Sequence, residues 1–164
     1  MNQVYFLAGK EEAGMNSFRC YKAVDLIAES KMLLHGRVRP MHFRVGNVDM
    51  DCVVDLDQTF FPGAEYAIHF SDGSEPTRVI YDGWGRNRIV WRQLELEVRY
   101  RNLGWKFFVK GKHLASMIPV EPTDPIGAVL NSRWVPRYTM MSREELPEIL
   151  AALMLHFPLL QIGI

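Results

Sequence analysis

Hydrophobic and polar residues alternate with a period of two along most of this 164-residue chain. The clearest case is Leu94–Arg101, in which apolar residues at even positions alternate with charged residues at odd positions. Such alternation predicts β-strands with one buried and one solvated face, and glycine-containing turns separate the alternating segments. We therefore predict short antiparallel strands over Val4–Leu7, Phe18–Tyr21, Met41–Val45, Met50–Leu56, Glu65–Phe70, Arg78–Tyr81, Arg88–Trp91, Leu94–Arg101, Trp105–Val109, His113–Val120 and Trp134–Met140.

Two segments break the alternation and predict helices. In Lys22–His35 the apolar residues recur at helical spacing, and Gly36 follows as a typical residue after a helix end. Pro147–Phe157, PEILAALMLHF, is apolar on nearly every side and follows a capping-box pattern that begins at Ser142. At roughly 17 Å this helix is too short for a bilayer core of roughly 30 Å, so we expect no transmembrane segment. The protein itself must then enclose it.

The fold class that follows is α+β and mainly β. We predict an antiparallel, closed or nearly closed β-barrel around a buried C-terminal helix, with one additional N-terminal helix. Residues 1–164 show no internal repeat and no long Gly/Ser linker, so we expect a single domain in which Glu121–Ser132 is a loop.

Composition narrows the function classes. Nineteen basic and nineteen acidic residues cancel, which argues against general nucleic-acid binding because that binding depends on neutralising phosphates. Cys20 and Cys52 are too few for a disulfide scaffold, so we expect buried thiols and a reducing compartment. The N-terminus does not read as a signal peptide, and the expected location is the cytoplasm, with peripheral membrane attachment as an addition.

Motifs for a bound cofactor or a catalytic group are not found in the sequence. It contains no nucleophile elbow, no phosphate-cradling glycine loop and no dinucleotide fingerprint, so no cofactor and no catalytic residue are predicted. Catalysis by residues that are distant in sequence stays open.

The first candidate site is basic. Arg99 and Arg101 on one predicted strand lie near Lys106, Lys110 and Lys112 on the strands that return beside it, and Arg86, Arg88 and Arg92 lie upstream. Clustered cations next to aromatic residues suit phosphate-bearing headgroups of an anionic membrane. The plainer interpretation is a solvated hairpin with weak cross-strand ion pairs.

The second candidate is acidic, with Asp49, Asp51, Asp55 and Asp57 on one face of a predicted strand. Alternate carboxylates on a strand lie about 7 Å apart, so a single cation cannot contact all of them. We expect no dedicated metal site here. A solvated face, a weak cation site and a contact with a basic partner are the three interpretations.

Two further alternatives concern function as a whole. A small enzyme or small-molecule binder would use a pocket near Trp84, Asp82 and His69, because the glycines beside Trp84 leave its ring uncovered. A structural subunit of a larger bacterial or phage assembly, or a homo-oligomer, would dock its apolar tail Leu159–Ile164 on a neighbour.

Three segments carry a resemblance to a known family: RVIYDGWGRNRIVW, LELEVRYRNLGWKFFVKGKHLASMIPV and RWVPRYTMMSREELPEILAALMLHF. Within them, Val109–Ala115 matches the pattern "hydrophobic, x, Gly, x, x, hydrophobic, Ala", and Arg137-Tyr138 precedes the apolar helix. From about Tyr66 onward the chain resembles the tubby C-terminal-like superfamily, which includes LURP-one-related proteins and phospholipid scramblases. The resemblance implies strands where Lys22–His35 reads as helix, and some tubby-like domains bind phosphoinositides. We therefore expect a non-enzymatic binding domain that contacts an anionic lipid headgroup or a protein partner through its basic hairpin.

Overall fold

The computed structural model describes residues 3–33, 35–56, 65–83, 86–91, 93–102, 104–119 and 134–143. These residues form strands joined by turns. In chain order the strands are β1 (Gln3–Glu12), β2 (Met15–Lys22), β3 (Asp25–Leu33), β4 (Val38–Val45), β5 (Val48–Leu56), β6 (Glu65–Phe70), β7 (Thr77–Gly83), β8 (Arg86–Trp91), β9 (Leu94–Arg101), β10 (Gly104–Val109), β11 (Lys112–Pro119) and β12 (Val135–Ser142).

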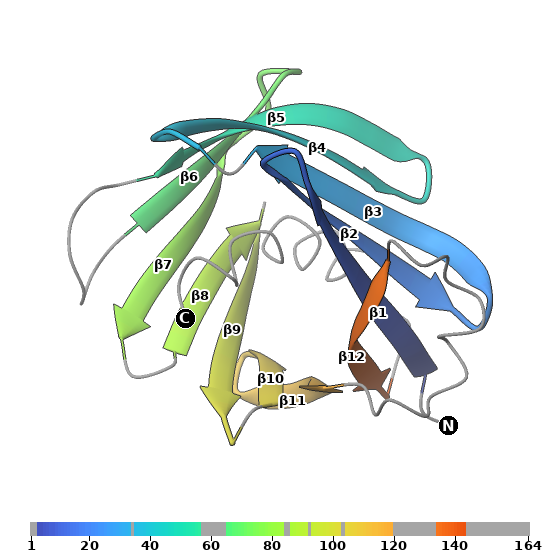
Figure 1. Ribbon diagram of the computed structural model, residues 1–164. Coiled ribbons are helices and arrows are strands. Elements are labelled where there is room, and N and C mark those ends of the chain that lie inside the picture. Colours follow the sequence, from blue (N-terminus) through green and yellow to red (C-terminus); the bar gives the residue numbers. More distant parts are fainter. Residues whose placement is uncertain are drawn as a thin grey trace.

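Each strand pairs antiparallel with the strands before and after it, and β1 pairs with β12 to close the barrel (Figure 1). Among the twelve described strands closure leaves no edge unpaired, which removes the usual site of edge-to-edge aggregation. Tight turns make the hairpins possible. Ala13 and Gly14 both have positive φ, at 53° and 74°, as do Lys110 and Gly111 at 50° and 77°. Paired positive φ values match the right-handed twist of the flanking strands.

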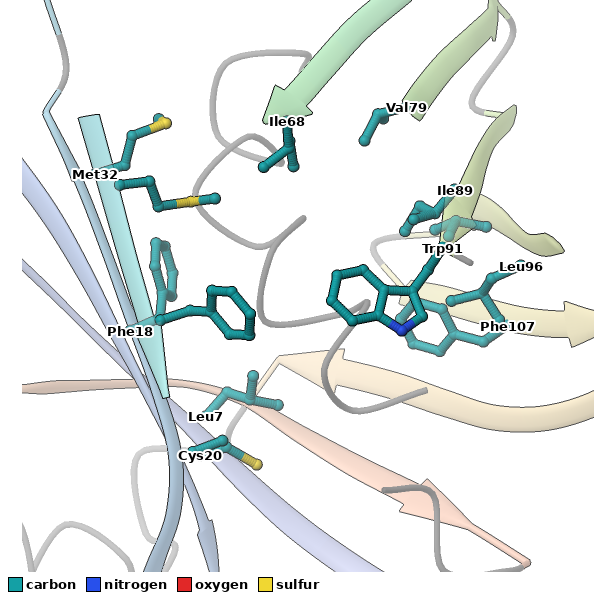
Figure 2. Close-up of a cluster of buried hydrophobic side chains, with 14 of the residues drawn as sticks. Leu7, Phe18, Cys20, Met32, Ile68, Val79, Ile89, Trp91, Leu96 and Phe107 are labelled. Carbon is teal, nitrogen blue, oxygen red and sulfur yellow. The ribbon is translucent and has the colours of Figure 1, made fainter. Parts of the chain in front are cut away.

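The core lies inside the barrel, where the inward residues of all parts of the wall meet. Side chains such as Leu7, Phe18 and Met32 from the neighbouring strands β1 to β3, and Phe107 from β10, point into the same interior (Figure 2). Phe43, Phe70 and Trp91 pack edge to face, with ring centroids 5.2 to 6.2 Å apart. Burial of each large side chain contributes roughly 1.5–3 kcal/mol, so this interior is the main source of stability among the described residues.

Each predicted strand overlaps an observed strand. The bounds agree to within two residues, except where the observed strand is longer. The β-barrel is also confirmed. The α+β class is wrong, because the described residues contain only antiparallel strands and turns. The predicted helix Lys22–His35 is a turn followed by β3. Two features hid this strand. Ile27 is an extra residue in a β-bulge, so Leu26 and Ala28 face opposite sides of the wall.

The second feature is the polar residue Ser30, which occupies a core position and is 2% exposed. A turn without a glycine also precedes β3, since Ala23 adopts a φ of 54° that non-glycine residues seldom take. The bulge places apolar residues at consecutive positions, and this imitates helical spacing. Tertiary pairing with β2 and β4 therefore overrode the local pattern.

The predicted C-terminal helix Pro147–Phe157, the loop Glu121–Ser132 and the tail Leu159–Ile164 lie outside the described residues. Within the part of the chain that the structure describes, no helix has the length and apolar character needed to cross a membrane.

Candidate functional site

A row of basic side chains crosses the outer face of the neighbouring strands β8, β9 and β10. Arg86 pairs across the strands with Arg99, and Arg99 pairs in turn with Lys106. Direct cross-strand neighbours have Cβ atoms about 4.5–5.5 Å apart. Three cationic side chains therefore stand side by side, and we call Arg86, Arg99 and Lys106 the basic row.

Arg99, at the centre of the basic row, is held by two contacts. Its Nε and one terminal nitrogen donate to Glu97 Oε1 and Oε2, at 2.7 and 3.1 Å, and its guanidinium carbon lies 4.3 Å from the ring centroid of Phe108. The hydrogen bonds to Glu97 raise the pKa of Arg99 above its ordinary value. The carboxylate and the ring fix the guanidinium in one orientation, which prepares its remaining donors for an external acceptor.

The two outer members of the basic row are less restrained. Arg86 and Lys106 are both exposed, and among the described residues neither has an ion-pair partner. Like charges on direct cross-strand neighbours are unfavourable. An external anion would relieve this repulsion.

The five residues predicted for this site do not all converge. Arg99 and Lys106 meet, and Arg101 extends the same face at the end of β9. Lys110 lies in the β10–β11 turn and Lys112 begins β11 opposite Val109, so they lie roughly 13 and 10 Å, respectively, along the strand direction from Lys106 at about 3.3 Å per residue. The first three residues can share one ligand, whereas the last two lie at the other end of the hairpin.

Arg86 was not among the five, although counting residues would have found it. Trp91 pairs with Leu94, so two residues connect β8 to β9, and Gly104 pairs with Arg101, so two residues connect β9 to β10. Counting back from these two turns places Arg86, Arg99 and Lys106 in one row. The signal was present in the turn lengths.

Ser116 continues the row on β11, opposite Lys106. Its Oγ lies 2.8 Å from His113 Nε2, and the His113 ring packs edge to face on Phe108 with centroids 5.5 Å apart. A bulge at Leu114 places His113 and Ser116 on the same face despite their spacing of three residues. This pair was not predicted, since the sequence analysis had no means of locating the bulge.

Beyond Ser116 the same row becomes apolar. Ser116 pairs with Met141, and Met141 pairs with Val4. Met141 is 41% exposed, Val4 38% and Ile118 48%, the last lying two residues beyond Ser116 on β11. We call Val4, Ile118 and Met141 the apolar shoulder, because they extend the basic row with exposed aliphatic side chains.

The acidic stripe lies elsewhere, on β5, and the basic residues His42 and Arg37 accompany its described members. His42 Nε2 and Nδ1 lie 2.7 Å from Asp49 and Asp51 respectively, and Arg37 Nε lies 3.4 Å from Asp55. Asp57 lies outside the described residues. Among the residues described, no group of three or more His, Cys, Asp or Glu side chains is arranged to hold a metal ion. The geometry favours the interpretation as a solvated, ion-paired face.

The alternative pocket was predicted from Trp84, Asp82 and His69. Trp84 lies outside the described residues, and Asp82 belongs to β7 with a side chain that is not described. His69 is exposed on the outer face of β6. This pocket therefore stays a prediction.

Cys20 and Cys52 are free thiols buried in the barrel wall, as predicted. Burial raises the pKa of Cys20 to about 12, and burial together with the nearby charge of Asp51 raises the pKa of Cys52 to about 12. Thiols of this kind remain protonated near neutral pH and are poor nucleophiles.

The basic row, Ser116 and the apolar shoulder lie on β8 to β12 and β1, and most of these strands fall in the segments that carry the resemblance to tubby-like domains. That resemblance, with the ligand class it implies, stays a prediction. Comparisons of this chain with protein-family models, with curated proteins and with solved structures find no match.

Proposed function

We propose that this protein is a non-enzymatic binding domain that contacts anionic lipid headgroups through the basic row. The observation that carries the proposal is the alignment of Arg86, Arg99 and Lys106 as direct cross-strand neighbours on the outer wall. Repulsion within such a row is tolerated where an anion neutralises it. The oxygen atoms of one phosphate group can accept hydrogen bonds from a guanidinium and an ammonium group at the same time.

The position of the basic row beside the apolar shoulder supports a membrane surface, rather than a soluble anion, as its ligand. The basic row leads through Ser116 into the apolar shoulder of Val4, Ile118 and Met141. Cations beside exposed aliphatic side chains fit the boundary between headgroups and acyl chains, since each type meets a matching layer. The protein-partner alternative requires no such apolar shoulder beside the cations.

The test is sedimentation with phosphatidylcholine vesicles that contain or lack phosphatidylserine. We expect the protein to sediment with the anionic vesicles at low salt and to be released at about 0.15 M salt, because surface charges are then screened beyond about 8 Å. Absence of sedimentation at low salt would contradict headgroup binding and favour a protein partner.

A double variant makes the test specific. Each basic residue near an anionic surface contributes about 1 kcal/mol, so Arg86→Gln with Lys106→Gln should weaken vesicle binding by roughly 30-fold. The matched control is Lys31→Gln with Arg37→Gln, which removes the same charge from an exposed residue of β3 and an exposed residue just before β4. Equal losses in both double variants would mean that net charge, and not the basic row, governs binding.

A further inference from the structure

A groove of about 320 Å³ crosses the outer face of β2, β3 and β4. The strands β3 and β9 are six positions apart in a ring of twelve, so this groove lies on the opposite side of the barrel from the basic row (Figure 1). Its polar side chains are Ser17, Arg19, Glu29, Lys31 and His42, and Trp134 supplies an aromatic wall. Phe18 and Ser30 belong to the inward-facing set and line the groove from its floor. We call it the Trp134 groove.

Trp134 is fixed in place by apolar packing. It precedes β12 in the chain and packs against a small cluster formed by Ala8 and Tyr21, with Phe6 and Leu26 beside them. This cluster is separate from the barrel core and covers the outer wall near β1 and β2. The indole ring therefore stands as a rigid side of the groove.

Arg19 is held between this ring and a carboxylate. Its guanidinium carbon lies 4.2 Å from the Trp134 ring centroid, and its Nε lies 3.5 Å from Glu29 Oε2. Among the described residues the buried Arg19 Nε makes no hydrogen bond of good geometry. Arg44 approaches Glu29 from the other strand, with Nε 3.3 Å from Oε1. Since Glu29 is shared between two guanidinium groups, Arg19 has N–H donors left for a ligand.

Ser17 and Lys31 add further donors to the Trp134 groove. Ser17 pairs with Lys31 across β2 and β3, and Lys31 pairs with His42 across β3 and β4. Lys31 is exposed, and within the described part of the chain it has no ion-pair partner. Among the described lining residues Glu29 is the single carboxylate, and Arg19 and Arg44 offset its charge, while His42 contacts Asp49 and Asp51. Arg19 and Lys31 therefore keep N–H donors that can bind an anion.

We propose that the Trp134 groove binds a small organic oxyanion, a carboxylate or phosphate ester that carries an aromatic group. Arg19 and Lys31 bind the oxyanion, Ser17 donates a further hydrogen bond, and the aromatic group of the ligand packs against Trp134. Small-molecule sites have volumes of about 300–1,000 Å³, so this groove suits a ligand at the small end of that range.

The test is isothermal titration calorimetry of the full chain with four probes: benzoate, phenyl phosphate, acetate and inorganic phosphate. We expect the two aromatic probes to bind several-fold more tightly than their non-aromatic counterparts, because only they can contact Trp134. The stronger of benzoate and phenyl phosphate then identifies the oxyanion. Absence of binding by all four probes at millimolar concentration would overturn the proposal.

Two variants assign the binding to this groove. Arg19→Gln should weaken every probe by about tenfold or more, since a hydrogen bond to a charged group contributes about 1.5–3 kcal/mol. Trp134→Leu should remove the preference for aromatic probes. Because the same ring holds the Arg19 guanidinium, acetate and inorganic phosphate should weaken as well, but by a smaller factor than the aromatic probes. Wild-type affinities in both variants would place the ligand elsewhere.

Two controls keep the result interpretable. If either variant lowers the melting temperature strongly, the exposed Lys31→Gln replaces it, and unchanged affinity for all probes in Lys31→Gln would contradict the proposal. The double variant Arg86→Gln with Lys106→Gln should bind the probes as wild type does. The groove and the headgroup site can therefore fail independently.

Discussion

The two opposite walls of the barrel arrange their outer charges in different ways. Across β2 to β5 one row reads Arg19, Glu29, Arg44 and Asp49, so that opposite charges meet at every strand boundary. Across β8 to β10 the basic row places like charges at two successive boundaries. In the first row the cross-strand neighbours form attractive pairs, whereas in the basic row Arg86 and Lys106 have no ion-pair partner among the described residues and Arg99 is paired with Glu97. Comparing the two rows thus separates cross-strand neighbours that attract from cross-strand neighbours that repel.

Both walls direct their inward side chains into the same hydrophobic core. The largest expected effect on stability therefore comes from truncating a core side chain. Phe43 on β4 and Phe107 on β10 are each fully buried. Phe43→Ala and Phe107→Ala should each lower the free energy of unfolding by about 3–5 kcal/mol, through lost burial and a residual cavity. Urea denaturation measures this, with the 66%-exposed Val24→Ala as a control expected to change little. A loss below about 1 kcal/mol at either phenylalanine would show that the walls do not share one core.

The two buried thiols give the next largest effect on stability. Cys20 lies on β2 and Cys52 on β5, in the wall that carries the row Arg19, Glu29, Arg44 and Asp49. Burial raises the pKa of Cys20 and of Cys52 from 9.0 to about 12, so the folded protein retains protons that the unfolded chain releases. Their contribution is complete below pH 9 and is lost as the pH rises toward 12, at about 1.4 kcal/mol per pH unit for each thiol.

Urea denaturation at a series of alkaline pH values measures this loss. Cys20→Ala should reduce the thiol part of the slope by about half, whatever its effect at neutral pH. A slope that is identical in wild type and Cys20→Ala would contradict the buried-thiol explanation.

The smallest effect tests the charge comparison itself. Glu29→Gln should lower the free energy of unfolding by up to about 1 kcal/mol, because it leaves Arg19 and Arg44 facing each other across a partly buried site. Lys106→Gln should raise it by a few tenths of a kcal/mol, about the size of one cross-strand pair, because it removes a like-charge neighbour of Arg99. Urea denaturation at low and high salt measures both, and added salt should reduce both differences.

Effects of the same sign in Glu29→Gln and Lys106→Gln would remove the distinction between the two walls. In that case the basic row would be as well compensated inside the protein as the row through Glu29. Opposite signs at low salt would support the contrast between the row through Glu29 and the basic row.

Part of the candidate site was predictable by simple counting. Alternation in Leu94–Arg101 fixes which side chains face outward, and the two-residue connections on either side of β9 fix the register with β8 and β10. Arg99 and Lys106 were predicted together because they lie on neighbouring predicted strands, and counting residues back from the turns would have placed Arg86 beside them. Lys110 and Lys112 were grouped with them for the same reason, although they lie at the other end of the hairpin.

Other parts depended on β-bulges, which a local pattern does not show. The extra residue Ile27 made β3 resemble a helix, and the extra residue Leu114 brought His113 next to Ser116. A bulge moves every later side chain of a strand to the other face, and its position is set by packing against the neighbouring strands. The Trp134 groove is a further case, since Trp134 and Arg19 meet only after β12 closes on β1.

The amino-acid sequence alone determined that this chain forms short strands, because period-two alternation can bury one face only in a sheet. It also determined the charges of the hairpin strands and the burial of both cysteines. The tertiary structure decided the closure of the barrel, the identity of β3 as a strand and the meeting of Trp134 with Arg19. The physical reason is that closure and bulge positions minimise the free energy of the whole wall, to which every strand contributes through its neighbours.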